Sequence, residues 1–346
     1  MSGALPDKGN CRTAVVNSSS FGRYCAEAQE RLGALGHLER VDVDPSIDGA
    51  ELAERLDKFD FVVASVTPRF PRSFFENNDD VKLISRHGVG CDNVDLEAAR
   101  EHGVIVTRVA KADERDAVAE LSVALIMACA RHVTAACDAA MTGRWSERAG
   151  FVGLELSAAT VGVIGFGSIG SRVGEIMDRG FNSRVLAYDP HVSDDTIRTH
   201  GAEPTSLDDM LPQCDVLSFN AELTPDNYGM VGERELELLK DGAIVVNTAR
   251  GELTDEEALA RAATNGKISA VGLDVCEQEP PPEDHPLLQV PNLVLLPHVG
   301  SYTHATLERM DRKMAEDVEA VLNGRPPGEV VNPNVLQSQN RAGVTA

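Results

Sequence analysis

Residues 160–177 read TVGVIGFGSIGSRVGEIM, and this stretch decides the fold. A short apolar run leads into three glycines spaced as Gly165-x-Gly167-x-x-Gly170, and a pattern with helical spacing follows. The first glycine permits a tight turn, the second lets a pyrophosphate approach the backbone, and the third lets helix and strand pack closely. The free N–H groups at the start of such a helix bind phosphates. The stretch therefore predicts a strand, a dinucleotide-binding turn and a helix.

An acidic residue follows at the position where a bound dinucleotide would place a ribose. Asp189 ends the next strand pattern, SRVLAYD, and lies nineteen residues beyond Gly170. A carboxylate there accepts hydrogen bonds from ribose hydroxyls and repels the 2′-phosphate of NADP. Asp189 also precedes Pro190, so a turn-forming role is the alternative. The spacing favours NAD as the cofactor.

Short apolar runs alternate with helical patterns on both sides of this stretch, which is typical of parallel sheets covered by helices. Before it, four runs predict buried strands: TAVVN (13–17), FDFVVAS (59–65), VKLIS (81–85) and GVIVT (103–107). From the glycine turn onward, six runs predict a doubly wound sheet: TVGVIG (160–165), SRVLAYD (183–189), CDVLSFN (214–220), GAIVVNTA (242–249), ISAVGLDV (268–275) and NLVLLPH (292–298). A long helical pattern from about Asp113 to Gly143 links the two series, and another helix is expected from about Thr303 to Leu322. At 346 residues the chain is long enough for two domains, so the fold class is α/β with two doubly wound domains.

Composition narrows the choice of partners. The net charge of −23 and the absence of a basic patch argue against nucleic acid. Arg outnumbers Lys 25 to 7, a bias that a salt-rich cytoplasm and a GC-rich genome explain equally well. The seven scattered cysteines form no Cys-x-x-Cys pair, which argues against a disulfide framework and against a structural zinc site, and we expect no bound metal. The first residues lack a signal-peptide pattern, and the most apolar stretch, 117–130, is shorter than a membrane span. We expect a cytoplasmic protein without a membrane partner.

Three ionisable residues occur where strands of the second series end. Arg250 follows GAIVVNTA, Glu279 lies just beyond ISAVGLDV, and His298 ends NLVLLPH. Any one of them alone is best explained as a solvated strand-end residue. Together they form a set that suits the reduction of a ketone, because His donates a proton near neutral pH and a carboxylate favours its charged form. A guanidinium pairs with a substrate carboxylate and polarises the carbonyl.

These motifs carry a family resemblance. GFGSIG with YDP, NTARGEL, GLDVCEQEPPP and LLPHVGS, in this order, resemble the signatures of the D-isomer-specific 2-hydroxyacid dehydrogenases. RHGVGCDNVDLEAA (86–99) and AVAELSVALIMA (117–128) resemble the substrate loop and interdomain helix of that family. The similarity runs from about residue 60 to 325. It implies a flavodoxin-like substrate domain split between residues 1–113 and 302–335, a central Rossmann NAD-binding domain at 114–301, and a tail at 336–346.

The resemblance also implies roles for individual residues. Arg250 would bind and polarise the substrate, and Glu279 would pair with the acid/base His298. The backbone at Val89 and Gly90 would hold the substrate carboxylate, and Arg86 matches a position that phosphoglycerate dehydrogenases use for substrate. The residues predicted to contact NAD are Gly165, Gly167, Ser168, Ile169, Gly170, Asp189, Thr248, Ala249, Arg250, Asp274, His298 and Gly300.

Some positions depart from the family pattern. Glu114 stands where relatives often have Asn, and FNAELT (219–224) lacks the usual proline. Ala64 stands where phosphoglycerate dehydrogenases usually carry an arginine, although Arg69 could substitute from the next loop. Phosphoglycerate is therefore possible but not favoured over glyoxylate, hydroxypyruvate or another small 2-oxo acid.

Two other functions stay open at this point. The family's transcriptional corepressors sense NADH and can retain the same three residues, but this chain lacks a long disordered tail. Phosphite and formate dehydrogenases take hydride from other donors, and the formate enzymes carry Gln where Glu279 stands. We also expect a homodimer, because the helical pattern at 113–143 is apolar on many faces and Trp145 lies near its end.

Overall fold

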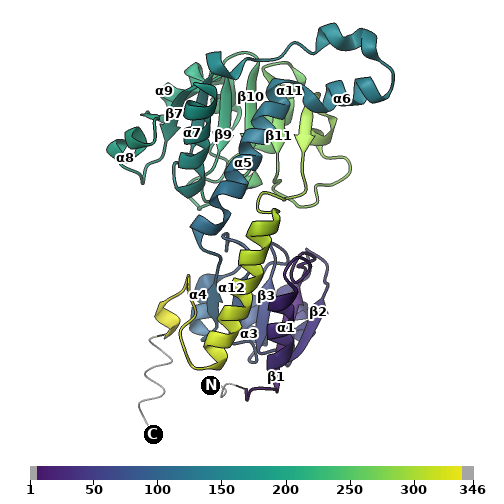
Figure 1. Cartoon of the computed structure of the whole chain (residues 1–346), viewed down its shortest axis with the longest axis vertical. Helices are drawn as coiled ribbons and strands as arrows, with labels where there is room; N and C mark the ends of the chain where they lie inside the picture. Colours follow the sequence, from purple (N-terminus) through teal and green to yellow (C-terminus); the bar gives the residue numbers. More distant parts are fainter. Residues whose placement is uncertain (1–5, 337–346) are drawn as a thin grey trace. The chain divides into compact units, whose positions relative to one another are not determined.

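The computed structural model describes residues 6–336. The chain divides into two compact units, each of which is described by itself (Figure 1). Unit 1 comprises the chain up to Glu114 together with the chain from Ser301 onward, and unit 2 comprises Arg115–Gly300. These limits differ by one residue from the predicted boundaries. The predicted tail at 336–346 lies outside the described residues, apart from Leu336.

Unit 1 is built on a five-stranded parallel sheet. Its strands are β1 (Cys11–Val16), β2 (Gly36–Val41), β3 (Phe61–Ala64), β4 (Leu83–Arg86) and β5 (Ile105–Thr107). Their order in the sheet, β2-β1-β3-β4-β5, is the flavodoxin-like doubly wound order. The predicted substrate domain therefore has its expected fold.

Helices cover both faces of this sheet because its strands are apolar on both sides. One face packs against α1 (Ala26–Leu35) and α12 (His304–Leu322). The other face packs against α2 (Gly49–Arg55), α3 (Arg72–Asn77) and α4 (Leu96–Glu101). Strand β2 was not predicted, because GHLERV is an edge strand with mostly exposed polar residues and lacks an apolar run.

Unit 2 is built on a seven-stranded parallel sheet. Its strands are β6 (Thr160–Ile164), β7 (Arg184–Tyr188), β8 (Glu203–Pro204), β9 (Val216–Phe219), β10 (Ala243–Asn247), β11 (Ile268–Leu273) and β12 (Leu293–Leu295). The six predicted strands are confirmed, and the two-residue β8 adds an edge that its sequence does not reveal. The order β12-β11-β10-β9-β6-β7-β8 reverses direction between β6 and β9, so a ligand crevice is expected where β6 ends.

Both faces of the second sheet are also covered. The α-helices on one face are α5 (Lys111–Ala130), α7 (Ser168–Phe181) and α8 (Asp194–Thr199). Those on the other face are α9 (Leu207–Met210), α10 (Glu233–Leu238) and α11 (Glu256–Thr264). Short 3₁₀ turns complete the unit: η1 (Trp145–Gly150), η2 (Leu156–Ala158), η3 (Leu211–Gln213), η4 (Gly251–Leu253) and η5 (Pro286–Gln289).

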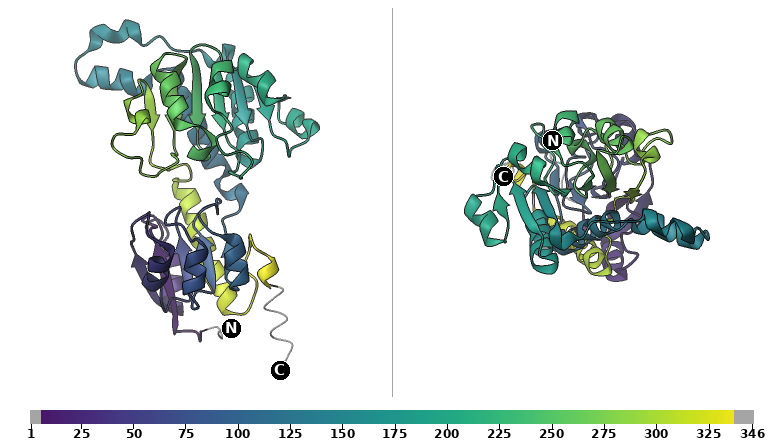
Figure 2. Two further views of the ribbon diagram at one scale, coloured as in Figure 1. Left: turned by 180° about the vertical axis from the view of Figure 1, so that it is seen from behind. Right: turned by 90° about the horizontal axis from the view of Figure 1, so that it is seen from above.

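The predicted continuous helix at 113–143 is wrong. The chain forms α5 and then α6 (Val133–Met141), bent by 61° at a break where His132 takes a left-handed φ of 50°. Residues 131–152, which we call the arm, return to the end of α5, where Leu154 N donates to Ala130 O at 2.8 Å. Figures 1 and 2 show α6 and η1 projecting from the unit. Within residues 6–336 no single helix has the length and hydropathy of a membrane span, although α5 and α6 pass that test as a bent pair.

Candidate active site

The glycine turn follows β6 and has the geometry that a bound dinucleotide requires. Gly165 has a φ of +81°, and a Cβ there would lie 2.5 Å from the Cα of Ala221. A Cβ on Gly170 would lie 1.9 Å from the carbonyl oxygen of Gly165, so helix α7 can approach the turn only without a side chain. At Gly167, by contrast, nothing lies within 4 Å of an added Cβ. The first and third glycines are therefore required by packing, and the second leaves open space for a ligand.

Asp189 lies at the end of β7, next to this turn. Its Oδ2 accepts a hydrogen bond from Phe166 N at 2.7 Å, and its Oδ1 accepts one from His191 N at 2.8 Å. The turn-forming role is therefore present, and the carboxylate is also tied directly to the glycine turn. Each carboxylate oxygen has a second lone pair, so ribose hydroxyls can still donate to Asp189.

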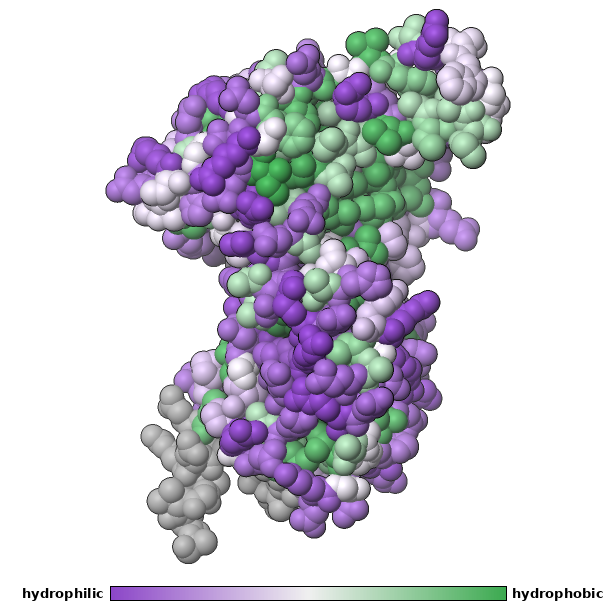
Figure 3. All heavy atoms as spheres, in the orientation of Figure 1, coloured by the Kyte–Doolittle hydropathy of each residue, from purple (hydrophilic) through white to green (hydrophobic). Residues whose placement is uncertain are grey.

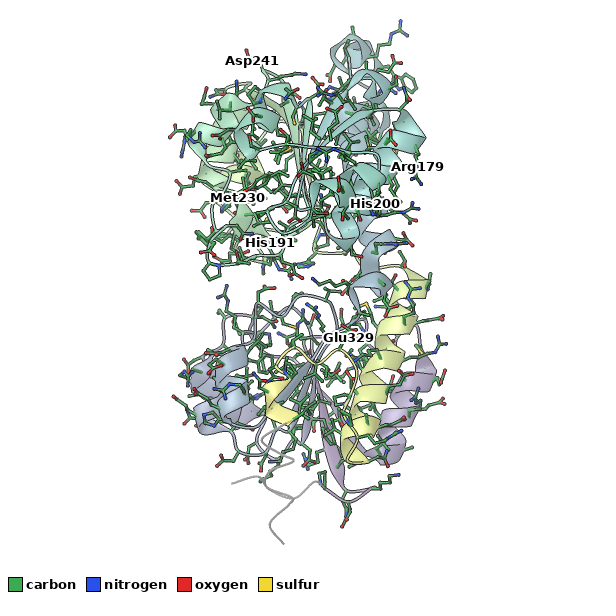
Figure 4. The ribbon with its side chains drawn as sticks, turned by 90° about the vertical axis from the view of Figure 1, so that its left-hand side faces the viewer. Arg179, His191, His200, Met230, Asp241 and Glu329 are labelled. Atoms are coloured by element: carbon green, nitrogen blue, oxygen red, sulfur yellow. The ribbon has the colours of Figure 1, made fainter. Side chains whose placement is uncertain are left out.

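The carboxyl ends of the strands in unit 2 share one edge. Figure 4 labels His191, just beyond β7, at that edge and Asp241, just before β10, at the opposite edge. Arg250, Glu279 and His298 follow β10, β11 and β12, which are consecutive neighbours in the sheet. Sheet topology therefore brings the three predicted catalytic residues to adjacent positions.

A buried amide shapes the loop that carries Arg250. Asn247 is 1% exposed, and its Nδ2 donates to Arg250 O at 2.7 Å while its Oδ1 accepts from Ala249 N at 2.9 Å. The Thr248 hydroxyl lies 2.6 Å from that of Ser122 on α5. Neither Asn247 nor Ser122 was predicted as a site residue, because in the sequence each resembles an ordinary strand or helix residue.

The loop after β10 also contacts the loop after β11. A Cβ on Gly251 would lie 2.1 Å from Glu277 N, so the two backbones touch at a position where only glycine fits. Arg250 and the segment that leads to Glu279 are thereby held in fixed register.

Glu279 and His298 form the predicted pair. His298 Nδ1 lies 2.8 Å from Glu279 Oε2 and 3.1 Å from Oε1, and the two side chains are 26% and 27% exposed. Within residues 6–336, His298 Nε2 has no hydrogen-bond partner. The carboxylate orients the ring through one nitrogen and leaves the other able to exchange a proton with a ligand.

Asp274 fixes the backbone that presents His298. His298 has a left-handed φ of 54°, an uncommon conformation for a residue other than glycine, and donates its N–H to Asp274 O at 2.9 Å. The Asp274 carboxylate accepts from Val299 N at 2.8 Å and from Gly300 N at 2.7 Å. Burial raises the pKa of Asp274, whereas these amides and the nearby His298 lower it. Asp274 therefore braces the turn, and its direct contact with NAD stays a prediction.

The predicted substrate loop lies in unit 1, after β4. Arg86 is 1% exposed; its Nε donates to Gly90 O at 2.9 Å and its Nη1 to Ala64 O at 2.7 Å. This geometry supports a role for Arg86 in bracing the loop with Val89 and Gly90, and its direct contact with substrate stays a prediction. A Cβ on Gly88 would lie 3.3 Å from Arg86 Nη2 and 3.8 Å from Glu114 Oε1, so the unusual Glu114 borders this loop.

One further pair in unit 1 was missed. His87 is buried, and its Nε2 lies 2.8 Å from Asp311 Oδ1 on α12, which connects the start of the substrate loop to that helix. Among the described residues, no group of three or more His, Cys, Asp or Glu side chains is arranged to hold a metal ion.

Comparison with known proteins identifies the family to which the chain is similar. Residues 123–300 match the family model described as "D-isomer specific 2-hydroxyacid dehydrogenase, NAD binding domain". The chain is 35% identical to a glyoxylate reductase of Thermococcus litoralis over 83% of this chain and 88% of that protein. It is also 35% identical to a D-3-phosphoglycerate dehydrogenase of Methanocaldococcus jannaschii, over 90% of this chain but 59% of that longer protein.

Solved structures agree with these matches. A D-lactate dehydrogenase from Aquifex aeolicus, crystallised with NAD and lactic acid, has a TM-score of 0.81 and 28% identity over 92% of this chain and 99% of that one. A glyoxylate reductase from Paecilomyes thermophila has a TM-score of 0.80 and 28% identity over 94% of this chain and 99% of that one.

Proposed function

Because the chain belongs to the D-isomer-specific 2-hydroxyacid dehydrogenase family, we propose that it is an NAD-dependent enzyme that interconverts a small 2-oxo acid and its D-2-hydroxy acid. The observation that carries the proposal is the 2.8 Å contact of Glu279 with His298. The pair lies at the strand-end edge that also carries Arg250 and the glycine turn.

The residues of unit 2 fit NAD. The open space at Gly167, the N-terminus of α7 and the carboxylate of Asp189 match its pyrophosphate and ribose. When bound, this cofactor supplies or accepts the hydride at C2 of the substrate.

In the reductive direction the chain's own groups handle charge and protons. Arg250 pairs with the substrate carboxylate and polarises the oxo group. His298 donates a proton from Nε2 to the carbonyl oxygen, and Glu279 stabilises the imidazolium through Nδ1. In the oxidative direction His298 accepts that proton from the hydroxyl group.

The substrate is proposed to be small. The relatives' names include glyoxylate, D-lactate and D-3-phosphoglycerate. Ala64 is fully buried where phosphoglycerate dehydrogenases usually carry an arginine, and Arg86 already donates to two backbone carbonyls. These features favour a substrate without a phosphate. Oxidation of NADH with a panel of 2-oxo acids tests the proposal, and failure to turn over any of them would leave the NADH-sensing alternative.

We expect NADH to be preferred over NADPH. Asp189 lies beside the glycine turn, where it accepts from the ribose and repels a 2′-phosphate. Asp189→Ala should narrow the ratio of kcat/KM for the two cofactors. Asp178→Ala, on the same unit, is the control and should leave that ratio unchanged. Equal kcat/KM values for the two cofactors in the wild type would contradict this assignment.

The proposal includes a homodimer formed through unit 2. Of the nine large hydrophobic side chains exposed within residues 6–336, five lie on or beside the arm: Met127, Val133, Met141, Trp145 and Val152. Met141 is 84% exposed and Trp145 70%, and Figure 3 shows apolar surface over α5 and the arm. Apolar surface of this kind is typical of an interface, and a second copy of the chain supplies an equally apolar partner.

Light scattering at micromolar concentration should therefore give twice the chain mass of 37.1 kDa. The double variant Met141→Asp/Trp145→Asp should shift the particle toward the monomer, because charges would enter an apolar contact. Tyr302→Asp changes an exposed aromatic residue of unit 1 and should stay dimeric. A monomer for the wild type would count against the dimer.

The proposal also places the enzyme in the cytoplasm, without nucleic-acid or membrane partners. Its support is the net charge of −23 and the presence of seven cysteines, all with free thiols.

A further inference from the structure

The segment that carries Glu279 is a long loop. It runs from the end of β11 at Leu273 to the start of η5 at Pro286, without a helix or strand of its own. Glu279 makes one local bond in it, accepting from Cys276 N at 3.2 Å. A loop of this length needs outside contacts if it is to hold a carboxylate within hydrogen-bond distance of His298.

A buried acid on α11 provides such contacts on both sides of Glu279. Glu256 is 7% exposed, and its Oε1 accepts from Glu277 N at 2.8 Å. Its Oε2 lies 3.3 Å from Nε2 of His285, the residue just before η5. We call Glu256, the amide of Glu277 and His285 the clasp.

The two ring nitrogens of His285 contact different groups. His285 Nδ1 accepts from Leu287 N at 3.4 Å at the start of η5, so a neutral ring carries its proton on Nε2. Nε2 lies at ion-pair distance, 3.3 Å, from Glu256 Oε2. One carboxylate thus accepts a backbone hydrogen bond before Glu279 and contacts the His285 ring after it.

Burial of Glu256 is costly and calls for an explanation. Burial raises the pKa of Glu256. The hydrogen bond from the Glu277 amide and the nearby His285 lower this pKa, whereas the negative carboxylates of Glu277 and Glu252 raise it further. Buried carboxylates are tolerated where they are hydrogen-bonded. The next residue of α11, Glu257, is exposed to solvent, so burial is specific to Glu256 and is not shared by its neighbouring acid.

The clasp is connected to the loops that carry Arg250 and Glu279. Glu277 N donates to Glu256, and the same nitrogen packs against Gly251: a Cβ added to Gly251 would lie 2.1 Å from it. Glu279 follows two residues later, and Gly251 follows Arg250 directly. A displacement of the Glu277 amide would therefore disturb both loops.

We propose that Glu256 and His285 are positioning residues that hold the Glu279 carboxylate against His298. The inference rests on the proposed function for its effect on turnover, but the contact between clasp and loop exists independently of any substrate. Neither residue needs to touch substrate or cofactor.

A series of variants distinguishes the two contacts of the clasp, Glu256 with Glu277 N and Glu256 with His285. Glu256→Ala removes the hydrogen bond to Glu277 N and the ion-pair contact with His285, and should lower kcat for reduction about 10- to 100-fold, the order of loss that misplacement by about 1 Å produces. Glu256→Gln keeps an acceptor for Glu277 N, and His285→Asn keeps an acceptor for Leu287 N; both should lose less. Glu257→Gln changes an exposed acid on the same helix and serves as the matched control. NADH binding, followed by fluorescence titration, should stay unchanged in all four.

Two readouts distinguish positioning from a general loss of stability. The high-pH limb of kcat for reduction should move to lower pH in Glu256→Ala, because His298 loses part of the negative charge that Glu279 places beside it. The ionisable groups near this pair are Asp274, which interacts with His298 and Glu279, and Cys276, which interacts with Glu279 and Glu256. In a Glu279→Gln background, Glu256→Ala should add less than threefold, because the carboxylate that it positions is already gone.

Multiplicative effects of the two substitutions, or wild-type kcat and pH limb in Glu256→Ala, would overturn the positioning role. If Glu256→Ala does not fold, Glu256→Gln and His285→Asn decide the matter by the same readouts. If the wild type reduces no 2-oxo acid, the proposed function fails, and hydrogen exchange still tests the clasp. Faster exchange at 274–285 in Glu256→Ala than in Glu257→Gln would support it, and equal exchange would refute it.

Discussion

His298→Ala is expected to lower kcat for 2-oxo acid reduction about 100- to 10,000-fold, the usual contribution of a general acid. His298 Nδ1 lies 2.8 Å from Glu279 Oε2, and Asp274 accepts from the two amides that follow His298, so the ring is held with Nε2 available to a ligand. NADH should still bind, because the glycine turn and Asp189 hold the dinucleotide. Initial rates and a fluorescence titration of NADH measure the two properties separately.

Two companion variants show whether the loss is specific. Glu279→Gln keeps the side-chain size but removes the charge that favours the imidazolium, so the pH limb for reduction should move to lower pH. His102→Ala changes an exposed histidine at the end of α4 and should keep wild-type turnover. Near wild-type turnover of His298→Ala on every accepted 2-oxo acid would show that His298 is only a strand-end residue.

Arg250→Lys is expected to fail in a different way, with a higher KM for the oxo acid as well as a lower kcat. A lysine ammonium is a point charge and cannot make the bidentate contact of a guanidinium with a carboxylate. Arg250→Ala removes the polarising charge altogether and should cost about 100- to 1,000-fold in kcat, as the loss of one oxyanion donor does. Steady-state kinetics with the best 2-oxo acid measure both parameters.

The control for Arg250 is Arg261→Lys on α11, an exposed residue whose ion pair with Glu257 is 3.7 Å long. It should leave both parameters unchanged. If Arg250→Lys matches the wild type in KM and kcat, Arg250 does not bind the substrate carboxylate.

Local pattern was sufficient for most elements of both sheets. The apolar runs of β1, β3, β4 and β5, and of six strands in unit 2, are visible because buried parallel strands are continuous in hydrophobicity. The edge strands β2 and β8 lack such runs, since only one side of an edge strand is paired and its residues can stay polar. The glycine turn was predictable because its spacing reflects steric limits that act within eleven residues, from Thr160 to Gly170.

Sequence by itself determined the α/β class, the dinucleotide turn, and the three strand ends that carry Arg250, Glu279 and His298. Only the tertiary structure decided how these groups are held. The left-handed backbone of His298 depends on Asp274, the close contact at Gly251 depends on the loop after β11, and the bend after α5 ends the predicted long helix. Such features arise between segments far apart in the chain, and their energy depends on contacts that no local spacing encodes.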